Sequence, residues 1–295
     1  MSNVLLAALL LGLPQEKPLP ERSSFLIEFQ VKRPGLWKAF GDFTDSRLAR
    51  QYTYVERVTE TTLDSKGNAK GSKANVFEVI PTRIDGFTYR RQIIKDGKPL
   101  TQKELDKQDS KQEEEIGKVE RERAKAMARS AKAKPNPAPT PPRPAPRIED
   151  SEILNAADFQ LLRRESIDGH PVILLSFKPN LAYKPRGDIA KMLQHATGHV
   201  WVSESDYELV KLEAQVIDTI SFGMGILGRV QPGSRGAFEW RKINDEIWLP
   251  LREDFTAKAR ILLVKGMHMR EVHEYSEHKK YSVNTEVQFQ APVEK

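Results

Sequence analysis

The chain has 295 residues, of which 39% are hydrophobic, 8% aromatic and 30% charged. It contains no cysteine, which excludes disulfide frameworks, thiolate nucleophiles, cysteine-ligated zinc, iron–sulfur clusters and a lipidated N-terminal cysteine. Forty-seven Lys and Arg against 41 Asp and Glu leave a formal charge of +6. Basic residues mostly alternate with acidic ones, which argues against nucleic-acid binding, whereas attraction to an anionic membrane surface needs fewer clustered charges.

The N-terminus begins with an apolar run, VLLAALLLGL, over residues 4–13. A membrane-spanning helix needs about 20 apolar residues, so this run is too short to cross a bilayer. Its length is typical of the apolar core of a secretory signal peptide, although residues 1–3 carry no Lys or Arg and no Ala-x-Ala cleavage site follows. We predict a signal peptide over residues 1–14 and an exported, soluble periplasmic chain, with a buried N-terminal helix as the alternative.

Residues 15–100 predict the first part of a β domain. After Pro34-Gly35, large apolar residues recur at spacings near three and four, which predicts a short amphipathic helix. Runs rich in Thr, Val, Tyr and Ile follow at 52–63, 75–80 and 88–94. Asp-Gly pairs at 85–86 and 96–97 predict hairpin turns, because both residues tolerate positive φ.

Residues 101–134 predict a charged helical insertion, and residues 135–147 a proline-rich linker. The insertion has four large apolar residues, Leu105, Ile116, Val119 and Met127, and its acidic residues gather early and its basic ones late, which suits the helix dipole. A helix that is polar nearly all round does not pack into a core, so we expect it to protrude, either as a spacer or docking arm or as a solvated insertion. The seven prolines that follow favour an extended, semi-rigid segment.

Residues 148–295 predict the remainder of the same β domain, with one helix at 188–195. Residues 199–203 and 208–216 predict a hairpin, and Val210 and Leu212 alternate with charged neighbours, so one face of the second strand is buried. Phe255 and Ile261 share one face of a later strand in the same way. Without the leader and the insertion, the chain suits a single β-rich domain of the sandwich or barrel kind.

Motifs that resemble catalytic or cofactor sites fail on their context. Residues 223–228 match the dinucleotide fingerprint Gly-x-Gly-x-x-Gly, but Pro232 and a strand pattern arrive before a helix can follow. His268, His273 and His278 lie five apart, an odd spacing that on a strand places neighbours on opposite faces. No nearby carboxylate pair completes a zinc set. We therefore expect no metal, no cofactor and no enzyme, with a site assembled from distant residues as the open alternative.

The second half of the chain carries a recognisable hairpin. Gly-His-Val-Trp-Val-Ser at 198–203 and Asp-Tyr-Glu-Leu-Val-Lys-Leu-Glu-Ala at 206–214 resemble the G-x-(I/V)-W-(I/V)-D … L-V-K-x-E hairpin of periplasmic outer-membrane lipoprotein-sorting (LolA-like) proteins. Residues 247–250 and 275–283 fit the same family. The resemblance covers roughly residues 150–285, with a weaker echo in 52–94, and the charged helix and linker depart from the family's compact pattern.

The resemblance implies a mainly β, α+β fold: a curved antiparallel sheet or unclosed half-barrel with helices over its concave face, which holds acyl chains between sheet and helices. The inner apolar surface of a half-barrel must be covered by a helix or a ligand. We predict Trp37, Phe40 and Phe43 as its cover. The predicted lining, for which ordinary core positions are the alternative, is Val210, Leu212, Phe255, Ile261 and Leu263.

Three functions fit these observations. The first is a non-enzymatic, exported carrier or envelope-maintenance protein that binds a lipid or lipoprotein acyl chain, with at most peripheral membrane contact. Each buried CH₂ contributes about 0.8 kcal/mol, so a long acyl chain binds without polar contacts. The second is an exported scaffold that contacts an envelope protein through residues 101–147. The third is an enzyme whose site is assembled from distant residues.

Overall fold

The computed structural model describes residues 17–32, 48–84, 87–132, 148–222, 228–261 and 265–281. The predicted signal peptide, the segment with Trp37, Phe40 and Phe43, the proline-rich linker and Leu263 lie outside these residues. In the part of the chain that is described, no helix has both the length and the apolarity to span a membrane.

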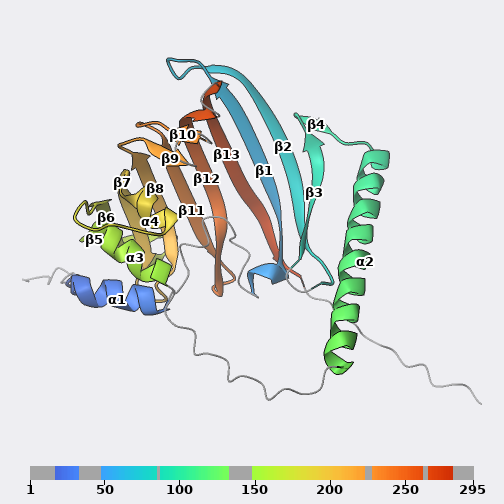
Figure 1. The fold of residues 1–295 in the computed structure, drawn as a ribbon, viewed down its shortest axis with the longest axis horizontal. Helices are drawn as coiled ribbons and strands as arrows, with labels where there is room; N and C mark the ends of the chain where they lie inside the picture. The colour runs from blue at the N-terminus through green and yellow to red at the C-terminus, as the bar shows by residue number, and fades with distance from the viewer. Residues whose placement is uncertain are drawn as a thin grey trace, which may run out of the picture.

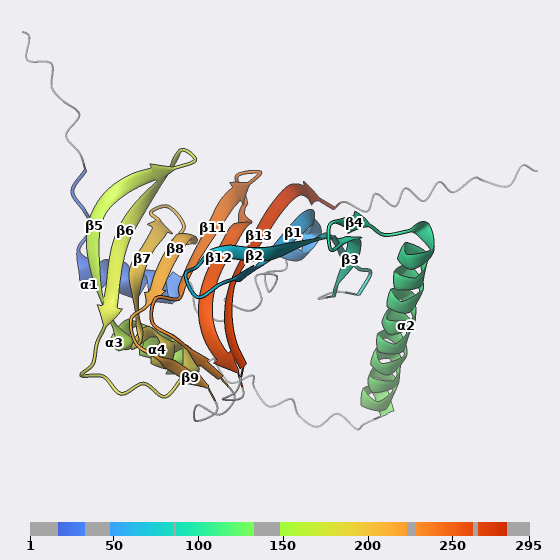
Figure 2. The same cartoon turned by 90° about the horizontal axis from the view of Figure 1, so that it is seen from above.

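One antiparallel sheet makes up most of the molecule (Figure 1). Its described strands are β1 (Tyr52–Leu63), β2 (Ala69–Pro81), β3 (Thr88–Lys95), β4 (Lys98–Pro99), β5 (Ala157–Ile167), β6 (His170–Pro179), β7 (Ala196–Ser203), β8 (Leu209–Val216), β9 (Ile220–Phe222), β10 (Gly228–Val230), β11 (Arg235–Ile243), β12 (Ile247–Ile261) and β13 (Lys265–Lys280). They run in the order β4-β3-β2-β1-β13-β12-β11-β8-β7-β6-β5, with β10 paired to β12 and β9 to β10. The order ends at β4 and β5, which do not pair with each other, and the strands bend along their length (Figure 2). The predicted unclosed, curved antiparallel sheet is confirmed.

The strand and turn predictions are accurate where alternation and turn residues coincide. β1 begins and ends at the predicted residues, and β7 pairs with β8 as the predicted hairpin. Asp96 and Gly97 adopt φ of 48° and 80°, the positive values expected of an Asp-Gly turn. After Gly228 the chain continues as β10 and β11, so the glycine-rich motif is followed by strands and not by the helix that a dinucleotide site requires.

Three helices cover one face of the sheet at its β5–β8 end: α1 (Arg22–Lys32), α3 (Ile148–Ala156) and α4 (Asp188–Leu193) (Figure 1). We call the face that they cover the inner face. α4 was predicted, whereas α1 was not, and the β pattern predicted from residue 148 onward is wrong for α3. Both helices pack into the main core through Phe25, Phe29 and Ile153, which are buried.

The predicted charged helix is α2 (Gln102–Lys132), which stands beside β3 at the opposite end of the sheet (Figure 1). It begins after Thr101, whose hydroxyl and backbone N–H both donate to the side chain of Glu104, the second of these bonds being one half of a capping box. Ile116 is buried, so part of the helix packs against the sheet edge, which composition alone did not reveal. Residues 121–129 are exposed and project as predicted.

Candidate functional site

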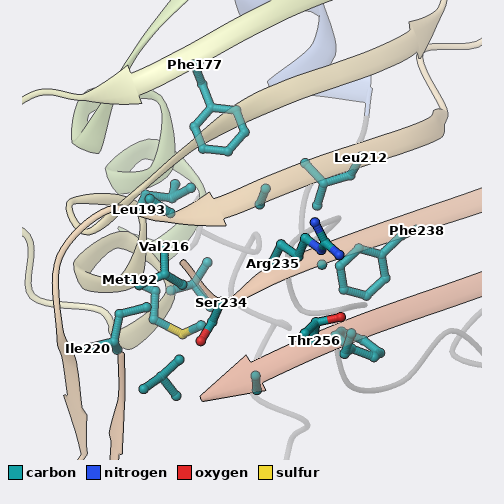
Figure 3. Close-up of a pocket in the computed structure, with 17 residues that line it drawn as sticks. Phe177, Met192, Leu193, Leu212, Val216, Ile220, Ser234, Arg235, Phe238 and Thr256 are labelled. Atoms are coloured by element: carbon teal, nitrogen blue, oxygen red, sulfur yellow. The ribbon is translucent and has the colours of Figure 1, made fainter. Parts of the chain in front are cut away.

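A cavity of about 420 Å³ lies between α4 and the inner face (Figure 3). Its wall is built by α4 and by strands β6 to β12, and nearly all of it is apolar. The large apolar side chains of the wall include Phe177, Leu193, Leu212, Ile220, Phe238 and Phe255.

Small residues create the space between these large side chains. Ala214, Ala257 and Gly236 line the cavity on β8, β12 and β11. A Cβ at Gly236 would lie 3.3 Å from the ring of Phe238 and 3.4 Å from the ring of Phe255. The glycine thus leaves room for these two rings to meet edge to face, with centroids 4.9 Å apart.

α4 is held over the cavity by a carboxylate from α3. Glu152 is buried and accepts the backbone N–H groups of Arg186 and Gly187, at 3.2 and 2.7 Å. These donors lie at the start of α4, where a helix leaves its first N–H groups without partners. Because Ile153 of the same helix packs into the core, α3 fixes the position of α4 and with it that of Leu193.

The cavity wall carries three polar residues, Ser234, Arg235 and Thr256, and the buried one of these, Ser234, is already engaged. Ser234 is buried and donates its hydroxyl to the carbonyl of Gln231 at 2.8 Å, and the same oxygen accepts the N–H of Lys258 at 3.0 Å. A satisfied hydroxyl offers a ligand little directional hydrogen bonding. Because nearly all of the lining is apolar, the cavity suits an apolar group of variable structure better than a polar one.

Two of the predicted lining residues, Leu212 and Phe255, border the cavity. Val210 is buried in the main core and is not part of the cavity wall. Ile261 lies at the end of β12, where its backbone pairs with Gly228 and Lys265. Leu263 and the three predicted cover residues fall outside the described residues.

The inner face continues past the cavity into a buried polar cluster. Opposite residues of paired antiparallel strands share a face, and the register runs from Phe238 to Glu253 and then to His273. Phe255 is likewise opposite Glu271. The cluster consists of Glu56, Arg90, Glu253, Glu271, His273 and Tyr275.

His273 joins two carboxylates within this cluster. Its Nδ1 lies 2.8 Å from Glu56 and its Nε2 2.7 Å from Glu271. Arg90 donates to Glu56 at 2.6 Å, and the hydroxyl of Tyr275 donates to Glu253 at 3.0 Å. Glu56 and Glu253 are 6% and 8% exposed, so both carboxylates depend on protein groups for their hydrogen bonds.

The surroundings shift the pKa values of His273, Glu56 and Glu253. Burial by itself lowers the pKa of His273, but hydrogen bonds to Glu56 and Glu271 outweigh it and raise that pKa to about 9. Burial also opposes ionisation of Glu56, yet His273 and Arg90 bring its pKa below the ordinary value. Burial raises the pKa of Glu253. At neutral pH, His273 is therefore an imidazolium that bridges Glu56 and Glu271.

The prediction that the odd spacing of the histidines places neighbours on opposite faces of a strand is wrong for His273 and His278. β13 contains one extra residue opposite Thr53–Val55, and Glu277 has a φ of 55° at this bulge. Both histidines consequently lie on the face that carries Tyr54 and Tyr275, whose rings meet edge to face with centroids 5.8 Å apart. The ring of His273 stacks on Tyr275 at 6.3 Å, and the ring of His278 lies 5.7 Å from that of Tyr54. Within the described ranges, no group of three or more His, Asp and Glu residues is arranged to hold a metal ion.

The sequence interpretation missed the polar cluster, although part of its signal was present. Glu271, His273 and Tyr275 follow each other at a spacing of two, which on a strand places them on one face. Their partners come from β1, β3 and β12, and no spacing along the sequence connects those strands to β13.

The open sheet, its helix-covered face and the cavity between them define an unclosed half-barrel protein. No protein-family model matches the sequence, and no curated protein does. Among solved structures, the chain is similar to a LolA superfamily protein from Nitrosomonas europaea, with 12% identity and a TM-score of 0.30, covering 88% of this chain and 94% of that one.

Two further structures have comparable values. A DUF1329 family protein from Desulfovibrio piger shows 12% identity and a TM-score of 0.30, covering 89% of this chain and 93% of that one. An outer membrane lipoprotein-sorting protein domain from Vibrio parahaemolyticus shows 14% identity and a TM-score of 0.25, covering 83% of this chain and 91% of that one.

Proposed function

We propose that this protein is a non-enzymatic, exported carrier that binds a lipid or lipoprotein acyl chain in the cavity under α4. The observation that carries the proposal is the cavity itself, which is apolar on nearly all sides and bounded by both sheet and helix. Its volume lies within the range of about 300–1,000 Å³ that is usual for ligand sites. The sequence resemblance of residues 198–214 to LolA-like proteins points to the same ligand class.

The size of the cavity sets the expected affinity. If a methylene group occupies roughly the 30 Å³ of a liquid water molecule, about 420 Å³ holds on the order of a dozen methylenes. At about 0.8 kcal/mol each, their burial contributes roughly 10 kcal/mol. Loss of ligand freedom costs at least about 4 kcal/mol, which leaves a dissociation constant of roughly tens of micromolar or weaker for the part of the ligand inside the cavity.

The polar cluster beside the cavity supports an amphipathic ligand rather than a hydrocarbon. Phe255 lines the cavity, and the residue directly opposite it on β13 is Glu271. An acyl chain seated against Phe255 would direct its polar end toward Glu271 and Glu253. These carboxylates would accept hydrogen bonds from an ammonium or hydroxyl group.

Native mass spectrometry of the protein purified after export, followed by organic extraction and lipid analysis, tests the proposal. Stoichiometric lipid is the expected result. A lipid-free spectrum that is unchanged after addition of phospholipid or acylated peptide would overturn the proposal.

A pair of variants locates the ligand. Ala257→Phe places a ring in the cavity, whereas Ala182→Phe adds the same ring at an exposed position. We expect at least a tenfold loss of binding of a phosphatidylethanolamine with a fluorescent acyl chain for the first variant and none for the second, with both retaining the far-ultraviolet circular dichroism of the wild type. Equal binding by the two variants would place the ligand elsewhere.

A further inference from the structure

The charges of α2 are sorted between two sides of the helix. Asp109 accepts from Arg91 on β3, with both nitrogen–oxygen distances at 2.9 Å. Glu113 and Glu120 both accept from Arg83, at 2.8 Å for the Nη1 and Nε contacts. Together with the buried Ile116, these acidic residues mark the side of the helix that faces the sheet.

The opposite side carries a row of basic residues, which we call the basic stripe. At 100° per residue its members fall within an arc of roughly 80°, centred about half a turn from Ile116. Every member is exposed. The stripe consists of Lys103, Lys107, Lys111, Lys118, Arg121, Lys125 and Arg129.

Few acidic residues offset the stripe. Glu114 is the one carboxylate in the same arc, and Glu104, Glu115 and Glu122 border it. Lys118 contacts Glu115 at 3.9 Å, a long ion pair between two exposed side chains that contributes little. The arc therefore keeps a net charge of about six positive, and about three positive when the three bordering carboxylates are counted with it.

The shape and composition of the stripe fit a flat anionic surface. From Lys103 to Arg129 a straight helix advances by about 39 Å, at 1.5 Å per residue. The arc contains no large apolar residue to insert into a bilayer, and no aromatic residue to stack on a base. What it offers is charge alone, spaced along a line, which is how polybasic segments attract anionic lipid headgroups.

The position of α2 leaves the cavity free. In both views the helix stands at the β3–β4 end of the sheet, whereas α1, α3 and α4 gather at the β5–β8 end (Figures 1 and 2). A surface that contacts the outward side of α2 would not cover α4.

We propose that the basic stripe of α2 docks the protein on an anionic bilayer surface through electrostatic attraction to lipid phosphates. The docking is independent of the ligand that the cavity takes. It turns the side of α2 opposite Ile116 toward the membrane.

Flotation with vesicles of phosphatidylcholine and phosphatidylglycerol in equal parts, compared with pure phosphatidylcholine, tests this docking. The stripe variant combines Lys111→Gln, Lys118→Gln, Arg121→Gln and Lys125→Gln. The control combines Lys66→Gln, Lys70→Gln, Lys178→Gln and Lys184→Gln, which removes the same charge from exposed positions elsewhere. Glutamine is a good helix former, so α2 should persist in the stripe variant, as circular dichroism will show.

Each basic residue near an anionic surface changes partitioning about fivefold, so we expect the stripe variant to bind on the order of a few hundred times more weakly than the wild type. The control variant should lose far less. Wild-type binding should also disappear near 1 M salt, where the Debye length falls to about 3 Å. Equal losses in the two variants, equal binding to uncharged vesicles, or no binding of the wild type at low salt would each overturn the proposal, the last in favour of an acidic protein partner.

Discussion

His273 makes the stability of this protein depend on pH, in a window that the structure defines. Its pKa is about 9 in the folded chain, against 6.5 when unperturbed. A raised pKa means that the folded state holds the proton more tightly, so the stabilisation is complete below about pH 6.5 and is lost as the pH rises through about 9. A difference of about 2.5 units corresponds to about 3 kcal/mol, at 1.36 kcal/mol per unit.

Urea denaturation at about pH 6 and about pH 9.5 measures this contribution directly, because the denaturation midpoint moves with the free energy of unfolding. We expect the wild type to lose about 3 kcal/mol between the two conditions, and His273→Gln to lose much less while being less stable at the lower pH. The imidazole proton signals of His273 should titrate near pH 9. An unchanged pH dependence in His273→Gln would refute the assignment of this effect to the bridge between Glu56 and Glu271.

Two further predictions concern the fold. A Cβ at Gly198 would lie 1.9 Å from the carbonyl oxygen of Glu213, so Gly198→Ala should cost about 3 kcal/mol or more in urea denaturation, whereas Gly71→Ala, with open space around it, should be neutral or slightly stabilising. Arg91→Gln removes the two hydrogen bonds to the half-exposed Asp109. Because both side chains are partly solvated, this should weaken the packing of α2 against β3 by roughly 1 kcal/mol. Amide hydrogen exchange in residues 102–120 should then become about fivefold faster, and unchanged exchange there would contradict the prediction.

The strands were predictable because two local signals coincide in them. β1 combines β-favouring residues with a turn sequence at its end, and both of its bounds were predicted. β8 alternates apolar and charged residues, and the predicted facing of Leu212 agrees with its burial. Signals of this kind depend only on neighbours in the sequence, which is why they survive without knowledge of the tertiary structure.

The helix α1 was not predictable to the same degree. Phe25 and Phe29 have the one-turn spacing of a buried stripe, but Ile27 and Val31 are also apolar and are 59% and 71% exposed. An apolar residue on every side removes the contrast that identifies an amphipathic helix. Here the packing partners on the sheet, rather than the sequence pattern, decide which side is buried.

The candidate site was predictable only on its apolar side. Alternation in β8 and β12 places Leu212 and Phe255 on the inner face, where they line the cavity. The polar cluster depends on Glu56 and His273, which are 217 positions apart in the chain. Their contact follows from the pairing of β1 with β13, a long-range choice that local patterns do not encode.

That pairing also has a consequence for how the chain reaches its folded state. β1 emerges early in synthesis, yet the partner of one of its edges is β13, the last strand among the described residues. Until β13 is available, this edge of β1 presents unpaired backbone groups to any other chain that it meets. Contacts so far apart in sequence form slowly, because the intervening loop must first be closed. The sheet is therefore completed only when β13 pairs between β1 and β12, in the middle of the strand order. A chain stalled before β13 would leave this edge of β1 open and would be prone to aggregate.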